Sequence, residues 1–157
     1  MNTYMQNKWS WIEGTHGMRA ELLKELSDAD LAFTPGGQNM MLGMLFRQLG
    51  EVEHSYVQSL RTFTQDWSYR NTTDGLDSSI AQLSAWYATL DAEMQSTASA
   101  FTDEELQKTV DRGGFNVTVD QQLDIYLQAL LIFFGKAAVY LKAMGKPLPK
   151  SMAEWID

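Results

Sequence analysis

Apolar side chains recur along most of the chain at spacings of three and four residues, the period of one face of an α-helix. Such stripes run over residues 5–26 and 40–64, from residue 78 onward, and over residues 119–144. A strand pattern is present only at residues 115–119. Four amphipathic helices can bury their apolar stripes against one another in a bundle. The pattern therefore predicts an all-α fold: a four-helix bundle of the up-down type that forms a single domain over residues 1–157.

Local signals mark where the predicted helices begin and end. The sequence PGG at 35–37 prevents helix before residue 40, and Asn39 is placed to cap the helix that follows. Thr118 and Gln121 have capping-box spacing, which predicts a helix start near residue 119. Gly145 suits the left-handed position that commonly ends a helix, so the last long helix is expected to end near residue 144.

The segments between these helices are polar or irregular. Residues 65–77 predict a surface connection. Residues 101–119 predict a long irregular connection before the last long helix, with a short helical turn opened by Thr102 and Glu105 and a little extended chain after it. A last short turn is expected at 151–154.

Composition narrows the classes of function. The 20 acidic residues exceed the 12 basic ones and give a net charge of -8, which repels phosphate backbones, so nucleic acid is not an expected partner. The absence of cysteine excludes disulfides, thiolate metal sites and a cysteine nucleophile. It also accords with a reducing compartment, and a cytoplasmic location is predicted.

No segment predicts a signal peptide or a membrane anchor. The sequence MNTYMQNKW at the start has no apolar core of the kind a secretory signal requires, so Met1 is taken as the start of the mature protein. Residues 126–144 are the most apolar, but Gln128, Lys136 and Lys142 interrupt them. A buried bundle helix is expected there, with no membrane contact.

Two passages resemble a known family. They are LSDADLAFTPGGQNMMLGMLFRQLGEVEHSYVQSL at 26–60 and TVDQQLDIYLQALLIFFGKAAVYLKAMGKPLP at 118–149. Both are similar to the DinB-like, or YfiT-like, family of bacterial four-helix bundles. In that family a loop rich in proline and glycine leads into the second helix, and the last helix ends in a phrase like GKAAVYLKAMGKPLP. The resemblance spans residues 5–149 and rests on pattern and order.

The resemblance implies a divalent metal such as zinc or nickel, held by three histidines. One belongs to the second helix and falls on Gln48, and a pair four residues apart in the last helix falls on Ala129 and Phe133. Alanine and phenylalanine cannot ligate a metal, and a neutral glutamine amide is a poor ligand for metals that favour imidazole. We therefore expect that the family metal site is lost and that no metal cofactor is bound.

Helical spacing places further polar residues near those positions. Gln122, Tyr126, Ala129 and Phe133 are expected on one face of the last helix, where they form a pocket with Gln48. Gln48 is either an amide that contacts a ligand or a buried polar residue bonded to a neighbour such as Tyr126.

Three basic or titratable residues fall on or near apolar stripes. Lys136 either extends to the rim of the pocket, pairs with an acid, or supplies a positive charge in place of the lost metal ion. His16 and Arg19 either line the mouth of a ligand site or mark a stripe that opens to solvent at one end. His54 is expected on a flank of its helix, at the surface.

Three classes of function are compatible with these residues. The first is a bundle without metal that binds a small anionic molecule or another protein, in a polar pocket bordered by Gln48, Tyr126 and at least one of His16, Arg19 or Lys136. The alternative is a divalent-metal-dependent enzyme, a hydrolase or thiol transferase, with ligands elsewhere, although 2 histidines cannot form a three-histidine site within one subunit. A structural homodimer is a third reading. Hydrolase and nucleotide-binding motifs are absent.

Overall fold

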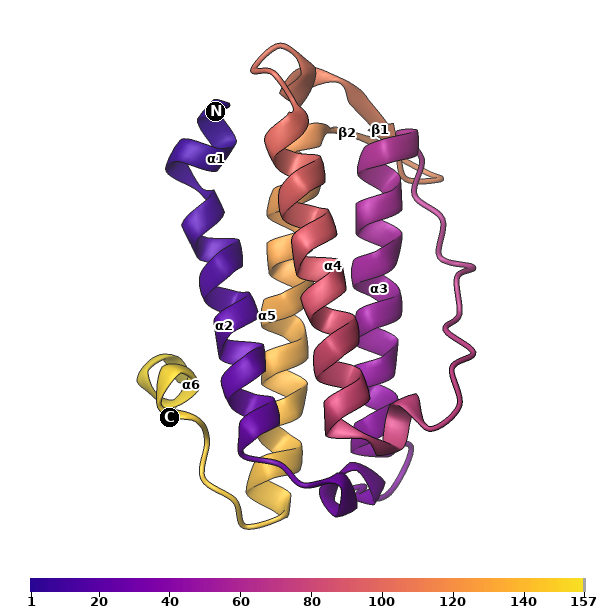
Figure 1. Cartoon of the computed structure of the whole chain (residues 1–157), viewed down its shortest axis with the longest axis vertical. Coiled ribbons are helices and arrows are strands. Elements are labelled where there is room, and N and C mark those ends of the chain that lie inside the picture. Colours follow the sequence, from indigo (N-terminus) through magenta and orange to yellow (C-terminus); the bar gives the residue numbers. More distant parts are fainter. Residues whose placement is uncertain (157) are drawn as a thin grey trace.

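Four long helices form the body of the protein, as predicted (Figure 1). The computed structural model describes residues 1–156, and in it these helices are α2 (Trp9–Lys24), α3 (Leu42–Thr62), α4 (Ile80–Ala100) and α5 (Val119–Ala143). A short α1 (Thr3–Asn7) precedes them, and α6 (Lys150–Ile156) follows, where a short last turn was expected. Figure 1 shows α6 lying outside the bundle, beside α2.

The helices do not simply alternate in direction. The first residues of α3 contact the segment before α4, with Gly43 against Asp77, and further along Arg61 is paired with Glu93. These contacts make α3 and α4 parallel, and residues 63–79 return along the outside of the bundle (Figure 1). At 1.5 Å per residue the 21-residue α3 is about 32 Å long. An extended chain covers about 3.3 Å per residue, so this connection is long enough.

The first predicted helix, residues 5–26, is interrupted at Lys8. Its φ and ψ of -125° and -23° lie outside the α-helical range and separate α1 from α2. Tyr4 and Trp9 are both buried, although five residues in a continuous helix would place them about 140° apart. The interruption changes the helical phase and lets both side chains reach the core.

The connection before α5 contains the turn and the extended chain that its sequence predicts. Thr102 and Glu105 exchange hydrogen bonds of 3.0 and 3.2 Å at the start of a 3-10 turn, η3 (Glu105–Gln107). Strands β1 (Thr109–Asp111) and β2 (Asn116–Thr118) then pair antiparallel. Two further 3-10 turns, η1 (Asp28–Ala32) and η2 (Leu76–Ser78), precede α3 and α4.

Most of the predicted helix ends are confirmed. The capping box of Thr118 and Gln121 opens α5, and Gly145, with φ of 72°, follows its C-terminus. Asn39 does not cap α3, because Met41 is the N-cap residue and the Asn39 amide donates to the Gly36 carbonyl at 2.8 Å. The carbonyl of Gly36, three residues earlier, thus competes successfully with the helix for this side chain.

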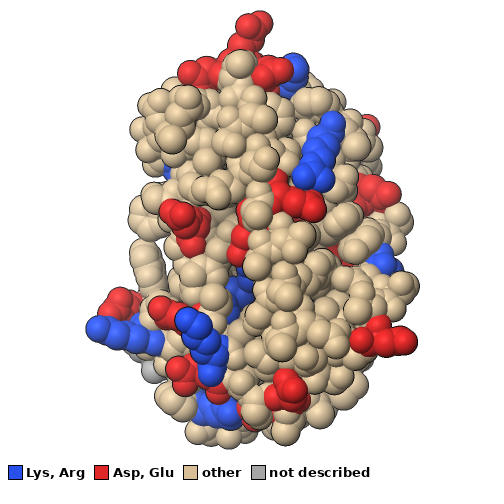
Figure 2. Space-filling model, in the orientation of Figure 1, with Lys and Arg blue, Asp and Glu red and all other residues tan. Residues whose placement is uncertain are grey.

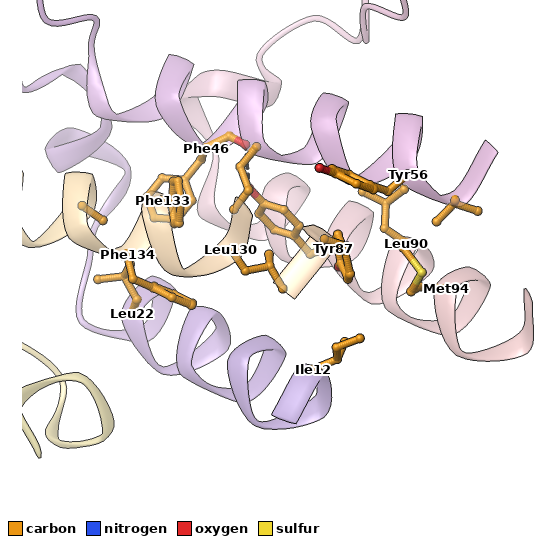
Figure 3. Close-up of a cluster of buried hydrophobic side chains, with 14 of the residues drawn as sticks. Ile12, Leu22, Phe46, Tyr56, Tyr87, Leu90, Met94, Leu130, Phe133 and Phe134 are labelled. Carbon is orange, nitrogen blue, oxygen red and sulfur yellow. Dashed lines mark hydrogen bonds between the residues drawn. The ribbon is translucent and has the colours of Figure 1, made fainter. Parts of the chain in front are cut away.

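One continuous core fills the bundle and draws side chains from all four long helices (Figure 3). The labelled members of this core in Figure 3 are Ile12, Leu22, Phe46, Tyr56, Tyr87, Leu90, Met94, Leu130, Phe133 and Phe134. Met41 and Met44 belong to the apolar stripe predicted over residues 40–64 and were expected to face the core, but they are exposed. Met41 is the N-cap residue and Met44 lies in the first turn of α3, on the side of the helix away from buried Leu42 and Gly43.

Of the helices described, α5 is the one long and apolar enough to cross a membrane, with a mean hydropathy of 1.4. It contacts α2 and α3 along the bundle and buries Tyr126, Leu130 and Phe134 among other residues, as a core helix does. On the face shown in Figure 2, acidic and basic side chains are interspersed between wide uncharged areas, without a basic patch.

Candidate functional site

The three positions implied by the family resemblance line one hollow between α3 and α5. Its volume is about 280 Å³, and Gln48, Ala129 and Phe133 share it with Lys136. Phe133 is buried and Ala129 half-buried, but Gln48 is exposed. The structure therefore places the three residues around one hollow. Gln48, which the apolar stripe over residues 40–64 predicts on the inward face of its helix, lies on the exposed side of α3 instead.

Phe133 closes the inner side of this hollow with an apolar ring. Its centroid lies 5.2 Å from that of Phe46 and 5.7 Å from that of Phe134, both in edge-to-face arrangements. In Figure 3 Phe133 and Phe46 point toward one another, whereas Phe134 points toward Leu22 of α2. The ring fills volume at the position where the resemblance implies an imidazole.

The donor atoms at this hollow do not fit a metal ion. Ala129 and Phe133 offer no lone pair, and Gln48 offers a neutral amide oxygen. Within residues 1–156 there is no group of three histidine, cysteine, aspartate or glutamate side chains arranged to hold one. The chemistry of this hollow therefore belongs to its amide, its ammonium group and its apolar walls.

A second hollow adjoins the first and shares Leu45, Gln48 and Lys136 with it. It measures about 260 Å³ and extends to Asn39 and Tyr140. Lys136 is exposed, so its side chain reaches the rim, which is one of the arrangements the sequence left open. These two adjoining hollows form the Gln48 groove.

Arg19 lies outside this groove, in the centre of the bundle. Its guanidinium donates to Glu53 of α3 and, at 2.5 Å, to Asp91 of α4, and it lies 4.0 Å from the centroid of the Tyr87 ring. Both alternatives drawn from the sequence are wrong for Arg19. Its side chain is buried, so it neither borders the entrance of a ligand site nor lies where the apolar face of α2 meets solvent. Two internal carboxylates supply what a buried cation requires.

His16 is also internal and joins the same cluster. Its Nε2 lies 2.7 Å from the Tyr126 hydroxyl, and its Nδ1 lies 3.2 Å from Oδ1 of Asp91. Burial, reinforced by the charge of Arg19, lowers the pKa of His16 to about 3, so the ring is neutral at pH 7. Because burial keeps the pKa of Tyr126 well above its usual value, the phenol donates to Nε2 and the Nδ1 hydrogen points to Asp91.

Glu53 is the most deeply buried acid of this cluster. Burial, which outweighs the attraction of Arg19, raises the pKa of Glu53 to about 7. Its Oε2 accepts no hydrogen bond from the described residues. A proton on Glu53 would leave Arg19 and Asp91 as a single balanced pair in the interior.

The sequence reasoning missed Glu53 and Asp91, although each carries a signal. Glu53 follows Leu49 by four residues on the buried stripe of α3, and Asp91 follows Tyr87 by four residues on α4. An acid on each of two apolar stripes, beside Arg19 on a third, is the pattern of an internal ion pair. None of these side chains lines the Gln48 groove.

Gln122 and Tyr126 also lie outside the groove, contrary to the pocket expected from helical spacing. Tyr126 is held by His16, and the Gln122 amide donates to Ser59 at 2.7 Å and to Gln65 at 2.6 Å. Arg112, which no motif marked, donates to the Gln122 oxygen at 2.5 Å. Gln122 therefore ties the β-hairpin to the upper end of the bundle.

His54 is half-buried and stacks on Tyr69, with ring centroids 3.7 Å apart. It lies on a flank of α3, as predicted, but under the connection that returns along the bundle and not fully at the surface. Nearby Glu51 pairs with Arg47 at 3.6 Å and accepts from the Asn71 backbone at 3.0 Å. Glu51 and His54 thus contribute to holding that connection.

A bundle of four long helices, with α3 and α4 parallel and an outer groove at Gln48, is the class of protein that this structure defines. Comparison with protein-family models finds no match, and comparison with curated proteins finds none. Among solved structures the chain is similar to the crystal structure of a DinB-like protein, YjoA, from Bacillus subtilis, with a TM-score of 0.72 and 17% identity. The likeness covers 90% of this chain and 95% of YjoA, so the chain has the DinB-like fold that the resemblance predicted.

Proposed function

We propose that the protein is a DinB-like bundle that works without a metal ion and binds a small anionic, hydrogen-bonding molecule in the Gln48 groove. The observation that carries the proposal is that the Gln48 amide and the Lys136 ammonium group line the same hollows. A carboxylate or phosphate held there would accept hydrogen bonds from both.

The charge of the groove supports an anion. Lys136 is the charged residue among those that line it, and no acidic side chain is among them. In a chain with a net charge of -8 this is a local exception, and it favours an anion at that point over the rest of the surface. The apolar walls from Leu45, Ile132 and Phe133 would take the body of the molecule.

The first test is binding of inorganic phosphate and small carboxylates, measured by calorimetry and by thermal shift. At ten times Kd a ligand adds about 1.4 kcal/mol to stability, which raises Tm by about 3–5 °C for a domain of this size. Lys136→Met is expected to remove this shift, and Gln48→Leu to weaken binding about tenfold. Lys24→Met, which removes an exposed lysine at the end of α2, is the matched control and is expected to bind normally.

Equal losses in Lys136→Met and Lys24→Met would show general charge screening and would contradict the proposal.

The second test is metal analysis of protein purified without a histidine tag. The expected content is far below one ion per chain. Zinc, nickel, manganese or iron at one equivalent after dialysis would overturn the metal-free reading and support the alternative, a metal-dependent enzyme.

A further inference from the structure

A large hollow lies on another side of α5 and is separate from the Gln48 groove. It measures about 750 Å³ and lies between α2, α5 and α6. Leu131, Phe134 and Gly135 of α5 line it, whereas Ala129, Ile132 and Phe133 face the Gln48 groove. This volume is within the range of sites that bind drug-sized molecules.

Two exposed tryptophans stand at its mouth. Trp11 of α2 is 58% exposed and Trp155 of α6 is 69% exposed. Their rings meet edge to face with centroids 6.4 Å apart. Half-buried Met18 and exposed Leu131 add to the apolar wall. Single exposed apolar side chains are common on protein surfaces, but several gathered around one concave surface indicate a binding site.

Two helical glycines create part of this volume. Gly14 of α2 and Gly135 of α5 both line the hollow, and a Cβ at either position would meet nothing within 4 Å. A glycine inside a helix costs about 1 kcal/mol relative to alanine. Close packing explains Gly43, whose Cβ would meet the Asp77 carbonyl, but it does not explain these two. What Gly14 and Gly135 provide is open space between two helices.

Helix α6 forms the third wall and is fixed in place at its start. Met152 is fully buried, and the Ser151 hydroxyl donates to the carboxylate of Glu21 on α2. The chain reaches α6 after Gly145 and two prolines, Pro147 and Pro149. The anchored first turn holds α6 beside α2 (Figure 1). Trp155, near the end of α6, therefore lines the hollow.

The charge of the hollow restricts what it can hold. Glu154 is the charged residue among those that line it, and its ion pair with Lys150, at 3.9 Å, is exposed on both sides. Such an exposed pair is weak, so a cationic or hydrogen-bonding head group can compete with Lys150 for the Glu154 carboxylate. Hydroxyls of Ser10, Thr15 and Ser151 are the other polar groups there. A carboxylate head group would be repelled, and an amine or alcohol would be accepted.

We propose that this hollow binds a small amphiphilic molecule with an aliphatic or aromatic body and a neutral or cationic head group. The body lies against Trp11, Leu131 and Phe134, and the head group lies near Glu154. Concavity favours a small molecule over a protein surface, which would require a flatter contact. The ligand class differs from that of the Gln48 groove in both polarity and sign of charge.

The test uses three probes with the same eight-carbon chain: octylammonium, 1-octanol and octanoate, below their micelle concentrations, by calorimetry and amide NMR shifts. Octylammonium and 1-octanol are expected to bind, and octanoate at least tenfold more weakly. Gly135→Leu, which fills the hollow, should weaken octylammonium binding at least tenfold. Gly17→Leu is the matched control, because Gly17 is also a helical glycine with open space around it and does not line the hollow.

Both leucine variants gain helix propensity, so loss of folding does not account for a difference between them. Lys136→Met should leave octylammonium binding unchanged, which separates this proposal from that for the Gln48 groove. Equal binding by Gly135→Leu and wild type, or octanoate binding as tight as octylammonium, would overturn the proposal. So would a dimer in sedimentation that binds none of the probes and dissociates in Gly135→Leu, because a second copy would then cover the hollow.

Discussion

Arg19 of α2 donates to Glu53 of α3 at a point where the two side chains are 2% and 1% exposed. The other arm of the same guanidinium donates to Asp91 of α4 at 2.5 Å. One cation thus joins three helices through groups that would be costly to bury alone. The ion pairs therefore fix how α2, α3 and α4 pack at the centre of an otherwise apolar core.

Arg19→Met should destabilise the protein strongly, because it leaves Glu53 buried without its cation. Breaking a buried ion pair from one side typically costs about 3–5 kcal/mol. Urea denaturation followed by circular dichroism measures the change. The double variant Arg19→Met with Glu53→Leu is expected to regain most of the loss, since Asp91 retains access to solvent. A loss below about 1 kcal/mol in the single variant would contradict the role assigned to the cluster.

His16 should make the protein less stable as the pH falls below about 6.5. Its pKa in the folded state is about 3, so between these values the unfolded chain binds a proton that the folded chain does not. Stability is then lost with falling pH, by on the order of a few kcal/mol at about 1.4 kcal/mol per pKa unit. His16→Gln keeps hydrogen-bonding groups but does not titrate, so its unfolding free energy should fall less between pH 6.5 and 4.5.

Glu53 acts in the opposite direction, and its raised pKa must be separated from the effect of His16. Between its usual value of 4.5 and about 7 the folded protein binds the extra proton, so this contribution declines as the pH rises. The comparison of wild type with His16→Gln removes this term because both contain Glu53. Parallel pH profiles for the two proteins would show that His16 is not buried as a neutral ring.

Two glycines should respond oppositely to alanine. At Gly43 a Cβ would lie 1.8 Å from the Asp77 carbonyl oxygen, so Gly43→Ala must separate α3 from the segment before α4. Overpacking of this kind costs about 1–3 kcal/mol. Gly17→Ala meets nothing within 4 Å and should stabilise α2 by up to about 1 kcal/mol. Thermal unfolding measures both, and a stable Gly43→Ala would contradict the close approach of the two segments.

Three histidines introduced at the Gln48 groove should create a metal site. The combined substitutions Gln48→His, Ala129→His and Phe133→His place three imidazoles around one hollow, which suits zinc or nickel. One equivalent of bound ion per chain is expected by metal analysis. The pair Gln48→His with Ala129→His, with Phe133 retained, should bind at least tenfold more weakly. A triple variant that folds but retains no metal would show that the three positions do not form the family site.

The helices and most of their ends follow from the sequence because their causes are local. Thr118 and Gln121 are three residues apart, and Gly145 acts on the turn just before it. The position of Gln48 was harder to predict, since each residue turns a helix by 100° and a residue beside buried Leu49 can lie on either side of the stripe boundary. Its grouping with Ala129 and Phe133 came from the family resemblance.

What only the tertiary structure decided is how distant segments meet. The polar segment 65–77 predicted a surface connection, but its return along the bundle, which makes α3 and α4 parallel, depends on where both of its ends pack. Arg19 finds Glu53 34 positions away and Asp91 72 positions away. The periodicity of one helix predicts that an ionisable residue is buried, but it does not predict which residue of a neighbouring helix will contact it. That contact is set when the helices pack, because burial makes an unpaired charge too costly to keep.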